Sequence, residues 1–159
     1  MKDSQKSALK LELRDGYLPN DPAYLAWLNG EPEETYRRYA PWSVEVSAAV
    51  ERGVDMRRAR VVSEPVSDYI RFEHAVTETV NLSGGERIRW LPRSRTWDLL
   101  LPSCDLWVVD EKIVLFYFFS GDGESAGSQV STDPAVVARC VTAFVEAWDR
   151  GIDHEEYHP

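Results

Sequence analysis

The chain has 159 residues, of which 43% are hydrophobic and 28% charged, and its formal net charge is −9. This length is typical of one domain that buries its own core. Non-specific binding to duplex nucleic acid depends on clustered cations, so the acidic balance argues against direct nucleic-acid binding. The sequence has no run of about 18 apolar residues and no leader-like N-terminus. We therefore expect a cytoplasmic protein without a membrane contact.

An N-terminal arm, residues 1–41, is expected to precede a core of residues 42–150. Alternating leucines over residues 9–13 predict a strand, and the apolar segment 22–28 predicts a short helix. The polar segment 31–38 is interpreted either as a mobile linker or as a second helix. This arm is a candidate surface for contact with a partner.

The core is expected to begin with a short buried strand at residues 58–63, which ends at a Glu-Pro turn. Apolar residues at helical spacing predict a helix over residues 66–80. Asn81 and the glycine pair that follows it are a stop signal for this helix. A strand led by glycine, residues 85–92, comes next.

Two apolar runs, residues 106–109 and 113–119, predict a hairpin of strands. The glycine-rich segment 121–127 lacks the lysine of a phosphate-binding loop and is interpreted as a flexible loop. A capped and strongly periodic segment predicts a final helix over residues 134–148. Residues 151–159 have the composition of a loose acidic tail. Together these elements predict one domain of the α/β class, with a mixed sheet flanked by helices.

Cysteines and histidines show no spacing that would predict a metal site or a cofactor. Cys104 and Cys140 are expected to be free thiols rather than a disulfide. The acidic tail contains His154 and His158, but its ligand types follow no fixed spacing. We predict no metal and no cofactor.

Positive charge is concentrated in the middle of the chain, where residues 52–95 carry nine arginines against six acidic residues. Arginine recognises carboxylate and phosphate groups with two parallel hydrogen bonds. Candidate ligand-binding residues for a small anion are therefore Arg71, Arg89 and Arg93, with Trp90 and Trp107 as candidate walls of a cleft. The alternative is that these arginines pair with the acidic C-terminal third of the protein itself.

The predicted hairpin and the residues before it resemble the active-site hairpin of the phospholipase D superfamily, whose motif reads His-x-Lys-x4-Asp followed by Gly-Ser. Aligned on Asp110, the chain has Ser103 at the histidine and Asp105 at the lysine, with Tyr117 and Phe118 at the Gly-Ser pair. The resemblance implies one half of a phospholipase D-like fold without its nucleophile and its phosphate-binding cation. We expect no phosphodiesterase activity and no catalytic residue, and we keep Asp105 and Asp110 as candidate ligand-binding residues.

Several strings, among them GERIRWLPR and LPSCDLWVVD, are similar to a family of uncharacterised actinomycete proteins encoded beside helix-turn-helix regulators. This resemblance implies a helix-turn-helix regulator as a partner, with complementary charge guiding the encounter. The two-fold arrangement of active phospholipase D-like proteins implies a homodimer. We predict a non-catalytic binding or regulatory module that partners such a transcription regulator or senses a small anionic ligand. The alternative is a nuclease-like or nucleotide-acting enzyme or toxin with an unrecognised site.

Overall fold

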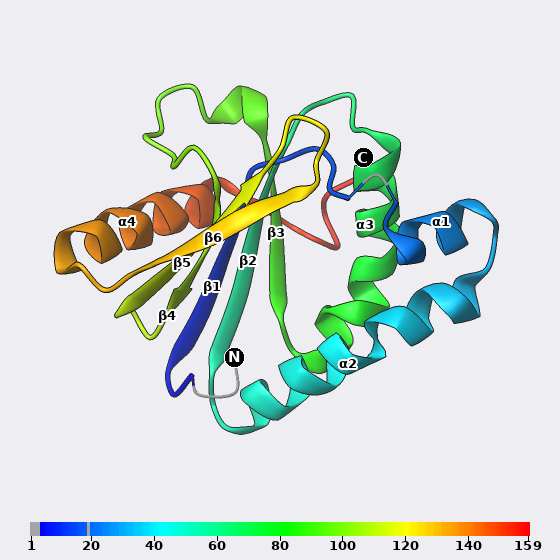
Figure 1. Ribbon diagram of the computed structural model, residues 1–159, viewed down its shortest axis with the longest axis horizontal. Coiled ribbons are helices and arrows are strands. Elements are labelled where there is room, and N and C mark those ends of the chain that lie inside the picture. Colours follow the sequence, from blue (N-terminus) through cyan, green and yellow to red (C-terminus); the bar gives the residue numbers. More distant parts are fainter. Residues whose placement is uncertain (1–3, 19) are drawn as a thin grey trace.

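A computed structural model describes residues 4–18 and 20–159 of the chain. Within these residues a seven-stranded mixed sheet, in the order β6-β5-β4-β1-β2-β3-β7, is flanked by four α-helices (Figure 1). This arrangement confirms the predicted class, an α/β fold with a mixed sheet.

The chain alternates between strands and helices in its first part and continues with three antiparallel strands, a helix and a short final strand. The strands are β1 (Ser7–Glu12), β2 (Asp55–Val62), β3 (Arg87–Pro92), β4 (Asp105–Val109), β5 (Ile113–Phe119), β6 (Ser125–Ser131) and β7 (Ile152–Asp153). The helices are α1 (Pro22–Leu28), α2 (Pro32–Glu51), α3 (Asp68–Val80) and α4 (Pro134–Arg150), and two short 3-10 turns are η1 (Leu82–Gly84) and η2 (Arg93–Arg95). β1, β2 and β3 are parallel, and the other neighbouring strands are antiparallel.

The two faces of the sheet are covered by different helices (Figure 1). On one face Leu9 and Leu11 of β1 pack in a core that includes Phe144 of α4. Successive side chains of a strand point to opposite faces, so Lys10 and Glu12 point towards the other face, where α1, α2 and α3 lie. β1 thus places the charged residues Lys10 and Glu12 between the sheet and the layer formed by α1, α2 and α3.

The N-terminal segment differs from the expected arm. β1 lies at the centre of the sheet, between β4 and β2. α2 is a single helix of 20 residues, whereas the sequence predicted at most a short helix at residues 31–38. Its buried face is narrow and consists of Thr35, Val46 and Ala49. Small, widely spaced apolar residues give a weak helical pattern, which is why the length of this helix was missed.

The end of the chain also differs from the loose tail that was expected. β7 pairs with β3, and Tyr157 is buried. The ring of Tyr157 stacks on that of Trp90 at 5.5 Å between centroids, and Trp90 Nε1 donates to His154 Nδ1 at 3.1 Å. His74 Nε2 is 2.9 Å from the backbone oxygen of Tyr157. The acidic composition predicted a loose tail, but the buried side chain of Tyr157 fixes this segment to the sheet.

The segment 121–127 is likewise shorter as a loop than expected, because β6 begins at Ser125. β6 is an edge strand of small polar residues that lacks apolar alternation, so its composition did not predict a strand. The two cysteines are free thiols, as expected.

Asp110 connects the hairpin turn to the N-terminus of the chain. Its carboxylate accepts the backbone N–H groups of Gln5, Lys6 and Ser7 at 3.0, 2.7 and 3.0 Å. Partial burial would raise the pKa of Asp110, but these hydrogen bonds hold it below its usual value. The residue also adopts a left-handed conformation, with φ of 53°, which Asp and Asn tolerate better than alanine does.

We expect Asp110→Ala to lower the free energy of unfolding by about 2–3 kcal/mol, because charge-assisted hydrogen bonds are lost and the left-handed backbone becomes strained. Asp110→Asn keeps one acceptor oxygen and the tolerance for this conformation, so its loss should be smaller. Urea unfolding of the three proteins measures both values. Equal stability of the native protein and the alanine variant would contradict the structural role of this carboxylate.

Candidate ligand-binding site

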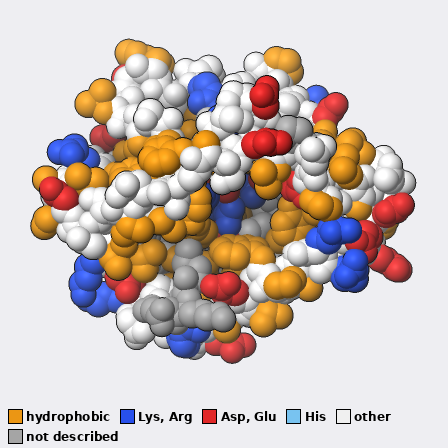
Figure 2. Space-filling model, viewed as in Figure 1, with side chains coloured by type: hydrophobic (Ala, Val, Ile, Leu, Met, Phe, Trp, Pro, Cys, Tyr) orange, Lys and Arg blue, Asp and Glu red, His pale blue; other side chains and the backbone are white. Residues whose placement is uncertain are grey.

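A pocket of about 440 Å³ opens on the face of the sheet that carries α2 and α3. Its floor is formed by side chains from β1, β2 and β4, and its walls come from β5, α2, α3 and the segment after β1. Figure 2 shows this hollow, with Lys and Arg atoms at its bottom and hydrophobic side chains around its opening. The pocket therefore combines an apolar entrance with a charged floor.

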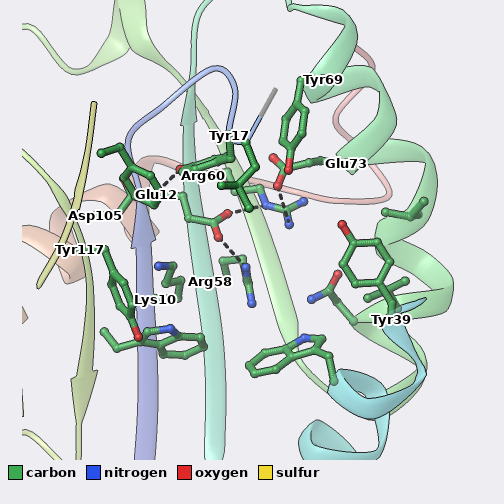
Figure 3. Close-up of a pocket in the computed structure, with 17 residues that line it drawn as sticks. Lys10, Glu12, Tyr17, Tyr39, Arg58, Arg60, Tyr69, Glu73, Asp105 and Tyr117 are labelled. Atoms are coloured by element: carbon green, nitrogen blue, oxygen red, sulfur yellow. Dashed lines mark hydrogen bonds and ion pairs between the residues drawn. The ribbon is translucent and has the colours of Figure 1, made fainter. Parts of the chain in front are cut away.

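The register of the sheet assembles the charged floor. Lys10 lies opposite Arg58, and Glu12 lies opposite Arg60, because β1 and β2 pair in parallel. Glu12 accepts hydrogen bonds from Arg58 Nη1 at 2.5 Å and from Arg60 Nε at 2.8 Å (Figure 3). Arg58 Nε also donates to Glu86 at 2.8 Å. Glu12 therefore bridges two arginines, and Arg58 bridges two glutamates.

Burial and ion pairing have opposite effects on the pKa of Glu12. Burial alone would raise the pKa of Glu12, but the adjacent guanidinium groups of Arg58 and Arg60 outweigh it and hold the pKa at about 2. Buried charges of this kind are costly unless they are paired and hydrogen-bonded. Glu12 is therefore ionised at neutral pH and keeps both guanidinium groups in fixed positions.

Glu73 of α3 approaches the floor from the helical layer. Its carboxylate is 3.5 Å from Arg60 Nη2, while Arg60 Nη1 donates to Thr77 at 2.8 Å. Burial raises the pKa of Glu73 to about 7, although Arg60 opposes the shift. This carboxyl group therefore exchanges its proton near neutral pH, a property often found at functional sites.

Asp105, at the start of β4, closes another side of the floor. Tyr17 Oη donates to its Oδ2 at 2.6 Å, and the backbone N–H of Leu13 donates to its Oδ1 at 2.9 Å. Burial raises the pKa of Asp105, and the hydrogen bond from Tyr17 opposes this shift. The carboxyl group is thus held in one orientation by two donors.

Lys10 is the charged residue of the pocket with the fewest polar contacts. Its side chain is only 8% exposed. Its Nζ lies 4.6 Å from the ring centroid of Tyr117 and 5.7 Å from that of Trp107. Within residues 4–18 and 20–159 no hydrogen-bond acceptor or carboxylate pairs with this nitrogen. Burial lowers its pKa, because the charged form is poorly solvated there.

Aromatic side chains form most of the apolar wall. The rings of Trp42 and Trp107 are 5.9 Å apart between centroids, and the guanidinium carbon of Arg58 lies 5.6 and 5.5 Å from them. Further aromatic rings around the pocket are those of Tyr17, Tyr39, Tyr69, Tyr117 and Phe119. Such walls suit a ligand with a planar apolar body.

Of the residues predicted to bind a ligand, Asp105 and Trp107 line this pocket. Trp90 is buried beneath α3, where the guanidinium carbon of Arg60 lies 4.9 Å from its ring centroid. Asp110 lies outside the pocket and binds the N-terminal backbone. The structure thus brings two of these four residues into one site.

The three candidate arginines lie outside the pocket, and each is near a carboxylate of the protein. Arg71 is 3.7 Å from Asp68, Arg89 is 2.7 Å from Asp153, and Arg93 is 3.3 Å from Asp15. Only the partner of Arg89 belongs to the acidic C-terminal third. A role of these arginines in binding an anion stays a prediction.

Sequence patterns did not predict the residues that form the charged floor, which are Lys10, Glu12, Arg58, Arg60 and Glu73. A signal was present, since charged residues alternate with apolar ones at the end of β1 (Lys10–Glu12) and in the middle of β2 (Arg58–Val61). Alternation of this kind commonly places the charged face in solvent. Here α2 and α3 lie against that face, and their packing is what buries the charges.

The carboxylates of the pocket are engaged by arginine and tyrosine side chains. Across the part of the chain that the structure describes, no group of three or more His, Cys, Asp or Glu residues is arranged to hold a metal ion. The same residues include no helix that is long and apolar enough to cross a membrane.

Fold and site together define an α/β protein with a pocket between its sheet and one helical layer. The chain belongs to the family described as a domain of unknown function, DUF6879, which matches residues 1–159. No protein with a curated description matches the chain.

Proposed function

We propose that this protein is a ligand-binding module whose pocket receives a small molecule with an aromatic body and an anionic group. This corresponds to the second mode expected from the sequence, the sensing of a small anionic ligand. Partnership with a helix-turn-helix regulator and formation of a homodimer stay predictions.

The observation that supports this function best is the position of Lys10. Burying an unpaired ammonium group destabilises a protein, and the other cations of the floor, Arg58 and Arg60, already have carboxylate partners. A carboxylate on the ligand would supply the acceptor that Lys10 lacks. The cost of burying this lysine would then be offset in the bound state.

The walls favour an aromatic body over an aliphatic one. The ring centroids of Tyr117 and Trp107 lie 4.6 and 5.7 Å from Lys10 Nζ, and the pocket opens between further aromatic residues. Contacts between aromatic rings stabilise a complex beyond the burial of apolar area alone. A volume of about 440 Å³ falls in the range of small-molecule sites.

The test is calorimetric titration with 3-phenylpropionate and with the uncharged 3-phenylpropanol. We expect the carboxylate to bind the native protein, and Lys10→Met to weaken its binding at least about tenfold, as expected for the loss of a charge-assisted hydrogen bond. Binding of the alcohol should change little. Lys112→Met, in the exposed turn of the hairpin, is the matched control and should leave both affinities unchanged.

Thermal unfolding of the same variants checks the physical premise. Lys10→Met removes a buried and unpaired charge, so we expect it to raise the melting temperature. A lysine that lowers stability yet strengthens binding is retained for function. Equal affinity of the native protein and Lys10→Met for 3-phenylpropionate, or no binding at all, would contradict the proposed function.

A further inference from the structure

Lys10 differs from the other lysines of the chain in a way that concerns reactivity. The chain has four lysines, Lys2, Lys6, Lys10 and Lys112. Lys6 and Lys112 are exposed, whereas Lys10 is 8% exposed and lies at the floor of the pocket. A primary amine in such a place can act as a nucleophile towards a molecule bound in the pocket.

We propose that Lys10 forms a reversible imine with the carbonyl group of the bound molecule, and that the molecule is an aromatic 2-oxo acid. This inference rests on the proposed function, since a ligand must occupy the pocket before the amine can react with it.

The surroundings of Lys10 increase the fraction of the uncharged amine, which is the reactive form, relative to an exposed lysine. The ring centroids of Tyr117 and Trp107 lie 4.6 and 5.7 Å from Nζ, and no carboxylate of the described residues pairs with it. Burial lowers the pKa of Lys10 and outweighs the charges of Glu12 and Asp105, which oppose the shift, while the positive charge of Arg58 acts in the same direction as burial. Lysines are activated as nucleophiles by desolvation and by a neighbouring cation.

The reaction needs proton transfer but no oxidant or reductant. The lone pair of Nζ attacks the carbonyl carbon, the carbonyl π bond breaks, and the oxygen takes up a proton to give a carbinolamine. Nitrogen loses its two protons during the sequence, and the hydroxyl group, protonated once more, leaves as water. The product is a C=N bond, and hydrolysis by the same steps returns the amine and the carbonyl compound.

Two carboxyl groups of the pocket can carry these protons. Asp105 precedes Trp107, the cross-strand partner of Lys10, by two residues, so both side chains lie on the face of the sheet that Lys10 occupies. Glu73 lines the pocket from the helical side (Figure 3). Burial raises the pKa of both groups, which brings them closer to the range in which a carboxyl group can both donate and accept a proton.

Arg58 is the side chain that would bind the carboxylate of a 2-oxo acid. It is the direct partner of Lys10 in the pairing of β1 with β2. Its Nε and Nη1 donate to Glu86 and Glu12, while Nη2 donates to no acceptor among the described residues. A ligand whose carboxylate adjoins its carbonyl can therefore contact Arg58 and Lys10 together. Its ring then lies among the aromatic walls.

The experiment uses phenylpyruvate with sodium cyanoborohydride, which reduces an imine to a stable secondary amine. We expect peptide mass spectrometry to show Lys10 increased by the mass of phenylpyruvate less one oxygen atom. Modification of Lys10 should saturate with phenylpyruvate, and 3-phenylpropionate should compete with it. Lys6 and Lys112 of the same molecules are internal comparators, and Lys10→Arg should lose the modification at this position.

The outcomes separate this inference from the proposed function. If 3-phenylpropionate binds but Lys10 is modified no faster than Lys112, the imine is wrong and ligand binding stands. If neither compound binds and Lys10 is not modified, both proposals fail. The comparison of lysines within the native protein decides the matter even if Lys10→Arg does not fold.

Discussion

Replacing Arg58 by methionine should lower the free energy of unfolding by about 3–5 kcal/mol, because the buried carboxylates of Glu12 and Glu86 lose a shared partner. Arg58 is 9% exposed and donates to both glutamates at 2.5 and 2.8 Å. Methionine fills a similar volume without supplying a donor. Equilibrium unfolding in urea measures the loss.

Arg57→Met is the matched control on the same strand. Its side chain points to the other face and is 24% exposed, and its one carboxylate partner among the described residues is Asp55, at 3.1 Å. Its guanidinium carbon also lies 5.6 and 5.5 Å from the ring centroids of Phe144 and Trp148. Partly exposed ion pairs contribute little, so we expect a loss of about 1 kcal/mol or less. Similar losses in the two variants would contradict the assignment of Arg58 to a buried charge network.

A second substitution tests whether the loss of stability in Arg58→Met comes from a carboxylate left without its partner. Combined with Arg58→Met, Glu86→Gln removes one of the two uncompensated charges and keeps an oxygen for Asn81, which donates to Glu86 at 2.6 Å. The double variant should be more stable than the sum of the two single losses predicts. Strict additivity would show that Arg58 and Glu86 contribute independently.

Strands β1 to β5 and helices α1, α3 and α4 could be predicted because their signals are local. The strand with alternating leucines, the hairpin around Asp110 and the capped helix that contains Phe144 all follow from residue spacing within one segment. Errors arose where the signal was weak, as in α2, whose buried face is made of small residues. They also arose in the last nine residues, where the packing of Tyr157 against Trp90 joins distant segments.

The pocket was harder to predict because the register of three strands and the position of two helices create it. The hairpin pattern indicates Asp105 and Trp107, but the alternating leucines alone give no reason to single out Lys10 and Glu12 between them. Whether such a face lies in water or beneath α2 and α3 depends on contacts between segments far apart in sequence. The charge of the middle region indicated arginines that lie outside the pocket, whereas Arg58 of β2, which lines it, was not predicted.

Acid should remove the stability that Glu12 contributes. Its pKa is about 2 in the folded protein, where Arg58 and Arg60 overcome the effect of burial, against an ordinary value of 4.5. A lowered folded pKa means that the unfolded state binds more protons between these two values. The stabilisation is therefore fully present above about pH 4.5 and is lost as the pH falls towards 2. The linkage corresponds to about 3 kcal/mol.

The comparison with Glu12→Gln isolates this effect, because the other titrating groups are common to both proteins. Burial raises the pKa of Glu73 to about 7, so Glu73 acts in the opposite direction at higher pH and is already protonated in both states below about pH 4. We expect the native protein to be the more stable of the two near neutral pH, and the difference to shrink on acidification. Urea unfolding at several pH values gives this difference directly. A difference that stays constant down to about pH 2 would mean that the carboxylate of Glu12 keeps its ordinary pKa, and that the two arginines do not hold it ionised at the floor of the pocket.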